Sequence, residues 1–432
     1  MGISNSVYTV TEYGAFTKGV AAEGYTPLPE KTFEALENFV LSARAESGTE
    51  AIELLSLTAR RGLGKIITAK NYVGVIVLPG GAVIEILPKI AGALSEEEAR
   101  RVFLNMLRAL REAPFRDFEI ARLETGRLNL FEIFIRFFLD DVTVLTRQGF
   151  AAAYTPLEEN AGAIRGKLMI PQNITHNIAH KERFFVRTEE FHIDRPENRL
   201  IKSALRLLQE ISRDGQSRRT AARLLSCFEG VSFSANYDAD FARCAPDRRL
   251  RRYERILAWC RIVLKGRGYT PFHGNEEALA LLFPMEKVFE SFVAEKIRQR
   301  LAGTGITLRV QDARHSLISA PARLFPLRPD LVLIHQGQVA VLDTKWKLLS
   351  DARNYGISQA DMYQMYAYGK KYGASRVFLL YPRPGAFAPE SLQFDSGDGV
   401  LVHVSFVDLK APEESLKKIL SEAGCLSPSL PL

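Results

Sequence analysis

Apolar and polar residues recur with two different periods along this chain, and together these periods predict a mixed α/β protein. Tyr8–Tyr13 alternates with the period of two that is typical of a strand, and Phe33–Val40 repeats at helical spacing. Similar patterns continue to about residue 165, and helical spacing then dominates. We therefore expect an N-terminal α/β domain over residues 1–165, a mainly helical segment over 166–275 and a C-terminal α/β domain over 276–432.

Three further helices are expected in or near the N-terminal part. The apolar residues of Ile52–Leu57 predict a short second helix. Ser95, with Glu98 three residues later, has the pattern of a capping box and predicts the start of a helix that runs to Leu110. The stretch Leu128–Leu145 is strongly apolar and also predicts a helix. Its charged residues and its length argue against a membrane span.

Two hairpins are predicted, one in each α/β part. Ile66–Ile90 contains two apolar runs separated by Gly80-Gly81. Leu331–Leu342 contains two shorter apolar runs separated by Gln336-Gly337. Short apolar runs on either side of a glycine-containing turn are typical of paired strands.

The second hairpin carries charges that a buried strand does not normally tolerate. Asp330 precedes its first strand, and Asp343 and Lys345 lie at the end of its second. Because side chains alternate along a strand, Asp343, Lys345 and Lys347 should share one face. Antiparallel pairing can bring Asp330 and Asp343 together. Two carboxylates, with the backbone carbonyl of Thr344, would suit Mg²⁺, a hard cation that keeps several waters.

Such a site would perform metal-dependent hydrolysis of a phosphodiester. Lys345, next to Asp343, would lie near the scissile phosphate, where it could position or help deprotonate the attacking water and offset charge in the transition state. The alternative is a surface hairpin in which the aspartate and the lysine form a cross-strand pair. The spacing of the residues does not separate the two interpretations.

Pro329-Asp330, followed by Asp343-x-Lys345, resembles the signature of the PD-(D/E)XK nuclease superfamily. The resemblance implies a nuclease domain with an αβββαβ core. Strands at Arg376–Tyr381 and Leu401–Val407 would complete this core. The resemblance thus supports the catalytic interpretation of the hairpin.

Three more residues match positions that this superfamily uses. Glu290, on a predicted amphipathic helix, is similar to an additional acidic residue of the superfamily, but it could instead form a salt bridge within its helix. Gln364 and Tyr368, four residues apart, resemble the pair that in RecB-like members lies against the active site and the DNA backbone. Ordinary packing of such a pair remains the alternative.

Motifs spread over most of the chain are similar to the McrC subunit family of McrBC-type modification-dependent restriction systems. They are Ile84–Lys89, Ile164–Leu168, Glu190-Phe191, Asn198–Lys202, Val288–Glu290, Arg328–Asp330, Leu342–Trp346 and Asp361–Gly369. The resemblance implies a type IV-like restriction endonuclease subunit that cleaves double-stranded foreign DNA, with modified cytosine as the expected target. It also implies a separate partner, a McrB-like AAA+ GTPase hexamer. In the family the N-terminal region contacts this partner and enters its ring, so we expect the contact within residues 1–165. A purely structural role for that region remains open.

The resemblance assigns GTP to the partner subunit, and the motifs of this chain agree. Arg61–Lys65 and Gly162–Leu168 superficially resemble a phosphate-binding loop, which requires G-x-x-x-x-G-K-[ST]. The first has Ala59 in place of the distal glycine. The second is one residue short and has Leu168 in place of the hydroxyl residue. We therefore expect no P-loop for GTP in this chain.

Charge and cysteine content narrow the class of protein further. The net charge of +7 and the pI near 9.1 suit a polyanionic partner. The cysteines Cys227, Cys244, Cys260 and Cys425 form no C-x-x-C pair, which argues against structural zinc, disulfides and iron–sulfur clusters. With no signal peptide and no long apolar run, we expect a cytoplasmic protein without membrane association.

The middle segment is rich in arginine. Arg248, Arg249, Arg251 and Arg252 form its densest cluster and predict a contact with DNA phosphates. Lys347 is a further candidate phosphate contact. A solvated helix face, or one paired with acidic residues of the partner, would explain the arginines equally well.

The sequence is therefore compatible with three functions. The first is an Mg²⁺-dependent endonuclease subunit that works with, and stimulates, a GTPase. The second is a stand-alone RecB-like nuclease. The third is a non-catalytic subunit that stimulates the GTPase or binds DNA, against which the intact Asp330, Asp343 and Lys345 argue.

Overall fold

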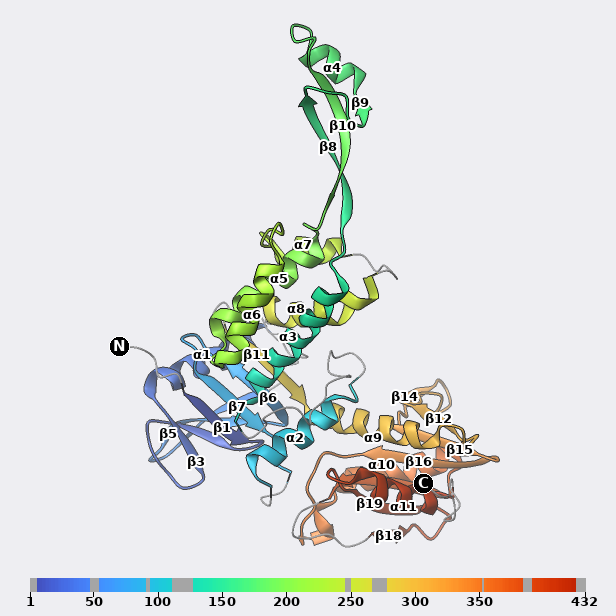
Figure 1. Cartoon of the computed structure of the whole chain (residues 1–432). Coiled ribbons are helices and arrows are strands. Elements are labelled where there is room, and N and C mark those ends of the chain that lie inside the picture. The colour runs from blue at the N-terminus through green and yellow to red at the C-terminus, as the bar shows by residue number, and fades with distance from the viewer. Residues whose placement is uncertain are drawn as a thin grey trace. The chain divides into compact units, whose positions relative to one another are not determined.

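The computed structural model describes residues 6–46, 54–90, 94–110, 127–244, 250–265, 278–351, 353–383 and 391–424. Helices and mixed sheets alternate along it, which confirms the α/β class. The chain divides into two compact units (Figure 1): unit 1 contains Met1–Leu130 and Gly268–Leu432, and unit 2 contains Phe131–Arg267. The three expected domains had boundaries at residues 165 and 275; in the structure the N- and C-terminal parts form one unit, because a strand of the C-terminal part completes a sheet of the N-terminal part.

The first sheet of unit 1 has the strand order β1-β7-β6-β11. Its strands are β1 (Val7–Thr11), β7 (Val83–Leu87), β6 (Tyr72–Val77) and β11 (Leu279–Pro284). The hairpin around Gly80-Gly81 is confirmed, with Val77 paired to Val83. β11 pairs antiparallel with β6 and passes close to Gly74, where a Cβ atom would lie 1.9 Å from the carbonyl oxygen of Leu281. Only glycine fits there.

The second sheet has the strand order β3-β2-β5-β4. Its elements are β2 (Ala15–Lys18), β3 (Tyr25–Leu28), β4 (Leu55–Arg60) and β5 (Gly64–Ala69), with α1 (Glu30–Glu46) packed on it. The predicted helix at Ile52–Leu57 is wrong: residues 51–53 lie outside the described residues, and Leu55–Arg60 is a strand paired with β5. Because Leu55 and Leu57 are two residues apart, their spacing also fits the period of two of a strand. Pairing with β5 makes this segment a strand.

Helix α2 (Glu96–Leu107) begins with the predicted capping box, in which Ser95 and Glu98 satisfy each other's backbone amides. A buried ion pair fixes this helix to the first sheet. Arg100 donates to both carboxylate oxygens of Glu85 at 3.0 and 2.7 Å, and Glu85 also accepts from the backbone amide of Leu130 at 2.8 Å. The charge of Glu85, which is fully buried, is thereby compensated.

The C-terminal sheet of unit 1 has the order β12-β15-β16-β17-β19-β18. Its strands are β12 (Thr307–Val310), β15 (Leu331–His335), β16 (Gln338–Thr344), β17 (Arg376–Pro382), β19 (Leu401–Val407) and β18 (Leu392–Asp395). The hairpin β15–β16 is confirmed, and its turn residues Gln336 and Gly337 both have positive φ. β16, β17 and β19 run parallel to one another.

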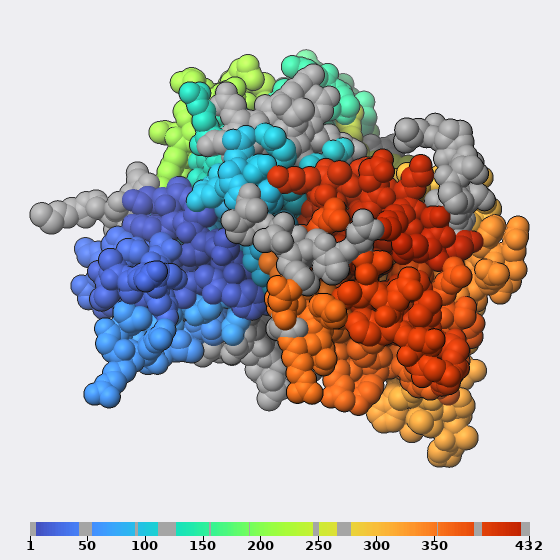
Figure 2. All heavy atoms as spheres, turned by 90° about the horizontal axis from the view of Figure 1, so that it is seen from below, coloured from blue at the N-terminus to red at the C-terminus, as the bar shows by residue number. Residues whose placement is uncertain are grey.

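Helices and a small additional sheet surround this C-terminal sheet. They are α9 (Met285–Leu301), β13 (Ser316–Ile318), β14 (Leu324–Pro326), the 3₁₀ helix η3 (Arg353–Gly356), α10 (Gln359–Tyr372) and α11 (Pro412–Glu422). Apart from β13 and β14, the elements from α9 to β17 follow the expected order αβββαβ. α9 contacts α2 of the N-terminal half, and the ammonium of Lys410 lies 2.8 Å from Glu98. Figure 2 shows the blue N-terminal residues of unit 1 beside its orange and red C-terminal residues.

Unit 2 combines helices with a long hairpin. Its elements are most of α3 (Leu130–Gln148), then β8 (Ala153–Ala161), β9 (Lys167–Leu168), α4 (Ile170–His176), β10 (Phe184–His192), α5 (Pro196–Ile211), α6 (Gly215–Cys227), α7 (Tyr237–Arg243) and α8 (Arg251–Lys265). β8 and β10 pair antiparallel along their whole length and extend away from the helices of the unit (Figure 1). The helical pattern predicted α3, α5, α6 and α8, but it did not reveal this hairpin.

No helix in the described part of the chain is long and apolar enough to cross a membrane.

Candidate active site

The register of the β15–β16 hairpin brings the two aspartates together. Leu331 pairs with Leu342, so Asp330 and Asp343 occupy facing positions one step further along. Asp343 is buried, and Asp330 is half-buried beside it. Burial and the negative charge of Asp330 raise the pKa of Asp343. The geometry therefore meets the condition on which the proposed metal site depends.

Asp330 is held in place by three hydrogen bonds. Its Oδ2 accepts from the backbone amide of Thr344 at 2.7 Å and from the hydroxyl of the same residue at 2.6 Å. Its Oδ1 accepts from the side-chain amide of Gln311 at 3.1 Å. Burial raises the pKa of Asp330, although the bonds from Thr344 oppose this. Thr344 was expected to contribute its backbone carbonyl to the metal site. Its amide and hydroxyl also orient the carboxylate of Asp330.

Asp343 begins a chain of polar contacts that crosses to α10. Its Oδ2 lies 2.7 Å from the Nζ atom of Lys345, which donates to Oε1 of Gln364 at 3.1 Å. The Gln364 amide in turn donates to the hydroxyl of Tyr368 at 2.7 Å. The four predicted residues are thus joined in one network. The (i, i+4) spacing of Gln364 and Tyr368 allows both to lie on one face of the helix.

Lys345 is a cation in this network. Burial by itself would lower the pKa of Lys345, but the adjacent charge of Asp343 raises the pKa overall. In this charged form the ammonium suits positioning of water and electrostatic stabilisation of the transition state. All the roles predicted for Lys345, including help in deprotonating the attacking water, stay predictions.

Glu290 and Gln311 complete the group. Burial, together with the charges of Asp330 and Asp343, raises the pKa of Glu290 to about 7. The Gln311 amide donates to Glu290 as well as to Asp330, so it bridges the two carboxyl groups. Glu290 therefore belongs to the same group of carboxyl side chains as the two aspartates. The sequence did not indicate Gln311, because only the pairing of β12 with β15 brings it there.

The residues present fit a magnesium ion. The buried carboxyl group of Asp343 lies beside that of Asp330, and the negative charge of Asp330 raises the pKa of Asp343 although the ammonium of Lys345 lies 2.7 Å from its Oδ2. A divalent cation would relieve this repulsion between the carboxyl groups. Among the described residues, no three His, Cys, Asp or Glu side chains are grouped closely enough to hold a metal by themselves. Asp330 and Asp343 would thus need a carbonyl oxygen and waters, which is how Mg²⁺ is commonly bound.

Comparison with known proteins identifies the family. Residues 67–382 match the model of the family described as McrBC 5-methylcytosine restriction system component. The chain belongs to this family. No curated protein matches the chain.

The fold of this McrBC family member is similar to that of chains in two solved structures from Thermococcus gammatolerans. One is described as a half-complex from a tetradecameric assembly of McrB AAA+ hexamers with bound McrC. The similar chain in it is 18% identical, with a TM-score of 0.73, and the match covers 96% of this chain and 100% of that one. The other is a cryo-EM structure of the McrBC complex, at 20% identity and a TM-score of 0.54, covering 70% and 89%.

The weaker DNA-binding predictions for this McrBC family member concern residues away from the carboxylates. Lys347 lies beyond the end of β16 and donates to the backbone carbonyl of Gly356. Arg251 and Arg252 are exposed in the first turn of α8 in unit 2. Arg248 and Arg249 lie outside the described residues. Contact of these side chains with DNA stays a prediction.

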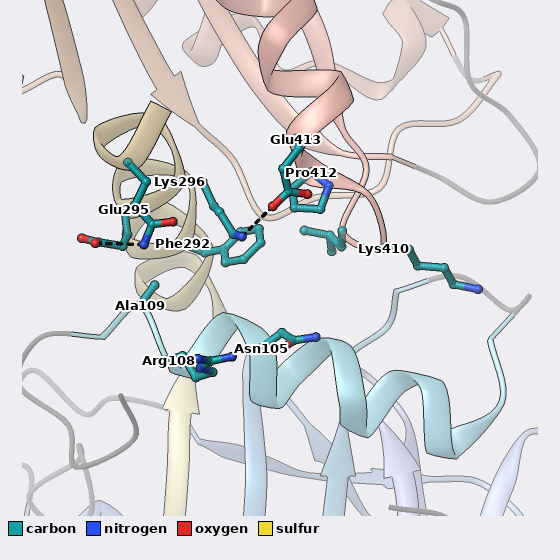
Figure 3. A pocket seen from close by; sticks show the side chains of 11 residues that line it. Asn105, Arg108, Ala109, Phe292, Glu295, Lys296, Lys410, Pro412 and Glu413 are labelled. Carbon is teal, nitrogen blue, oxygen red and sulfur yellow. Dashed lines mark hydrogen bonds and ion pairs between the residues drawn. The ribbon is translucent and has the colours of Figure 1, made fainter. Parts of the chain in front are cut away.

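A cavity elsewhere in unit 1 is distinct from the carboxylate group. It has a volume of about 470 Å³ and lies between α2, α9 and the start of α11 (Figure 3). Its lining is mixed in charge, and Lys296 forms an ion pair with Glu413 across it at 2.7 Å. None of the predicted site residues lines it. The carboxylate group on β15 and β16 is therefore the better candidate for chemistry.

Proposed function

We propose that this chain is the DNA-cleaving subunit of a McrBC-type restriction complex, an Mg²⁺-dependent endonuclease that works with a McrB-like AAA+ GTPase hexamer. The observation that carries the proposal is the convergence of Asp330 and Asp343, with Lys345 beside them. Membership of the McrBC family supports it, since the proposed chemistry is that of a restriction system. A surface hairpin with a simple aspartate–lysine pair would not bury Asp343 among carboxyl groups.

In the proposed mechanism, each residue has a role that follows from its contacts. Asp330 and Asp343 hold Mg²⁺, which when bound supplies Lewis-acid activation of the phosphate and a more acidic water. Lys345, kept charged by Asp343, stabilises the negative charge that develops on the phosphate. Gln364 holds the ammonium of Lys345 in position. Gln311 and Thr344 fix the orientation of Asp330 before substrate arrives.

Glu290 has a different role in this mechanism. With a pKa of about 7, it exists in both protonation states near neutral pH. In its ionised form it adds negative charge beside Asp330 and favours cation binding. In its protonated form it weakens that binding, so the affinity for Mg²⁺ falls as the pH is lowered below 7.

The partner proposal rests on family membership and on the surface of unit 2. The similar T. gammatolerans structure contains McrB AAA+ hexamers with bound McrC. In this chain the β8–β10 hairpin and α4 expose large apolar side chains, as a protein-docking surface does. They are Tyr154, Leu157, Ile170, Ile174, Ile178 and Phe191. We propose that this hairpin contacts the GTPase, which extends the expected contact region beyond residue 165.

The test is cleavage of duplex DNA, with and without 5-methylcytosine, in the presence or absence of the AAA+ partner and GTP. We expect cleavage only when all components are present, and none by Asp343→Ala. Because the hairpin belongs to unit 2 and the carboxylates belong to unit 1, Asp343→Ala should still stimulate the partner's GTPase. Cleavage by the chain alone would support a stand-alone nuclease. Stimulation without any cleavage by the unaltered chain would support a non-catalytic subunit.

A further inference from the structure

The segment between Gln311 and Asp330 has no role in the mechanism above, yet it begins and ends at the proposed site. The backbone amide of Gln311 donates to the carbonyl of Asp330 at 2.8 Å, which joins the two ends. Between them the chain forms the β13–β14 hairpin, closed at its base by the bond from Leu327 to His315 at 2.9 Å. In Figure 1 the hairpin lies beside β12, at the edge of the C-terminal sheet.

The β13–β14 hairpin exposes apolar side chains at every strand position but one. Leu317 and Ile318 of β13 are 40% and 39% exposed, and Leu324 and Phe325 of β14 are 47% and 67% exposed. Phe325 also has a φ of +56°, a conformation that is unfavourable for a bulky residue. A strained, exposed aromatic side chain beside a candidate active site points to a ligand contact.

The charge of the segment indicates what kind of ligand it would contact. Residues 313–329 contain Arg314, Arg323 and Arg328, all exposed, and no aspartate or glutamate. The acidic residue just before them, Asp312, is buried and paired with Arg314 at 2.7 Å. Exposed apolar side chains in a segment whose only aspartate, glutamate, lysine or arginine residues are arginines suit a polyanion with an apolar interior, which describes duplex DNA.

The base of the hairpin is fixed to the helix that carries Gln364 and Tyr368. The hydroxyl of Tyr372 donates to the carbonyl of Asp312 at 2.8 Å, and its ring lies 4.3 Å from that of His315. The hairpin is therefore held at a set position relative to the catalytic network.

We propose that the β13–β14 hairpin is a DNA-contact element of the nuclease site. Leu324 and Phe325 would press into a groove of the duplex and partly unstack a base step, while Arg323 and Arg328 bind the flanking phosphates. Phe325 lies five residues before Asp330, so an extended chain limits its distance from the carboxylates to roughly 17 Å. Because duplex DNA rises about 3.4 Å per base pair, the contact should lie within about five base pairs of the cut. The inference rests on the proposed nuclease function and assigns the positioning of DNA in that nuclease to the β13–β14 hairpin.

The experiment uses the full chain with its AAA+ partner, in an Asp343→Ala background that leaves the DNA uncut. The probe is a duplex with 2-aminopurine at successive positions around the cut site, whose fluorescence rises when a base is unstacked. We expect a rise in this background, and loss of most of it on adding Phe325→Ala. Adding Arg323→Ala should weaken binding about five- to tenfold near 0.1 M salt and reduce the salt slope by about one. Leu41→Ala and Arg61→Ala, at exposed positions of the other half of unit 1, are the controls.

Three results would overturn the inference in distinguishable ways. If Phe325→Ala and Arg323→Ala behave like their controls, the hairpin does not contact DNA, and the proposed nuclease function is unaffected. If they weaken assembly with the AAA+ partner but not DNA binding, the hairpin is a protein-docking surface. If the unaltered complex neither binds nor cuts DNA, the proposed function itself fails.

Discussion

The indole Nε1 of Trp346 donates to both carboxylate oxygens of Glu12, at 3.0 and 2.9 Å. Both side chains are buried, and Glu12 also accepts from the backbone amide of Lys89 at 3.0 Å. Trp346 follows Lys345 directly and packs against Phe289, the neighbour of Glu290, with ring centroids 5.5 Å apart. The first sheet of unit 1 is thus joined to the strand end that carries the candidate catalytic residues.

Trp346→Phe should destabilise the protein, because it keeps a ring against Phe289 but removes the indole donor from the buried carboxylate of Glu12. We expect a loss of about 1–3 kcal/mol in the free energy of unfolding, measured by chemical denaturation. The double variant Glu12→Gln, Trp346→Phe should lose less free energy of unfolding than the sum of the two single variants. In the double variant no buried carboxylate at position 12 is left without its indole donor. Strictly additive losses would show that the bond contributes little.

Glu290 makes the metal-free protein less stable as the pH rises. Its pKa is raised from the usual 4.5 to about 7, so between these values the native state holds a proton that the unfolded chain has released. This contribution is present below pH 4.5 and is lost as the pH rises through 7. Glu290→Gln should therefore be more stable than the unaltered protein at pH 8 with EDTA, and this advantage should be smaller at pH 5. Thermal denaturation at the two pH values measures it. An equal difference at both would contradict the raised pKa.

Mg²⁺ should stabilise the protein through Asp330 and Asp343. The repulsion between their carboxyl groups is relieved by a cation, so the thermal midpoint of the unaltered chain should rise with added Mg²⁺. At 100 times the dissociation constant the gain is about 2.7 kcal/mol. Asp343→Asn should be more stable than the unaltered chain without metal and should respond little to Mg²⁺. A full response by this variant would place the ion elsewhere.

Gln311 should matter for cleavage although it is not a metal ligand. Gln311→Ala removes the amide that bridges Glu290 and Asp330, so we expect cleavage to fall about 10–100-fold, the usual effect of losing a residue that orients a ligand. GTPase stimulation of the partner should not change. Gln299→Ala, at an exposed position of α9 outside the carboxylate group, is the matched control. Equal cleavage by both variants would remove Gln311 from the site.

Local patterns predicted the elements that hold the candidate site. Two short apolar runs and the turn at Gln336-Gly337 were sufficient to predict β15 and β16, and the register then placed Asp330 opposite Asp343. Gln311 could not be foreseen in this way, because it arrives through a strand pairing whose partner lies 19 residues or more along the chain. The roles of the site residues themselves stay predictions until cleavage is measured.

The errors have physical causes of the same kind. Leu55 and Leu57 were assigned to a helix, and pairing with β5 makes them part of a strand. The β8–β10 hairpin was missed because Val186 is the only buried residue among the described side chains of its two strands, so it has little apolar alternation to detect. Local patterns also could not reveal that β11 pairs with β6, about 200 residues earlier in the chain, which joins the N- and C-terminal parts in one unit.

That last pairing has a consequence for how the protein is made. While the ribosome is still producing unit 2, β6 has no neighbour on one side, and its backbone groups form an open edge that invites association with other chains. Only when Leu279–Pro284 leaves the exit tunnel can this edge close. A gene truncated before that point would therefore yield an aggregation-prone fragment and not a free-standing N-terminal domain.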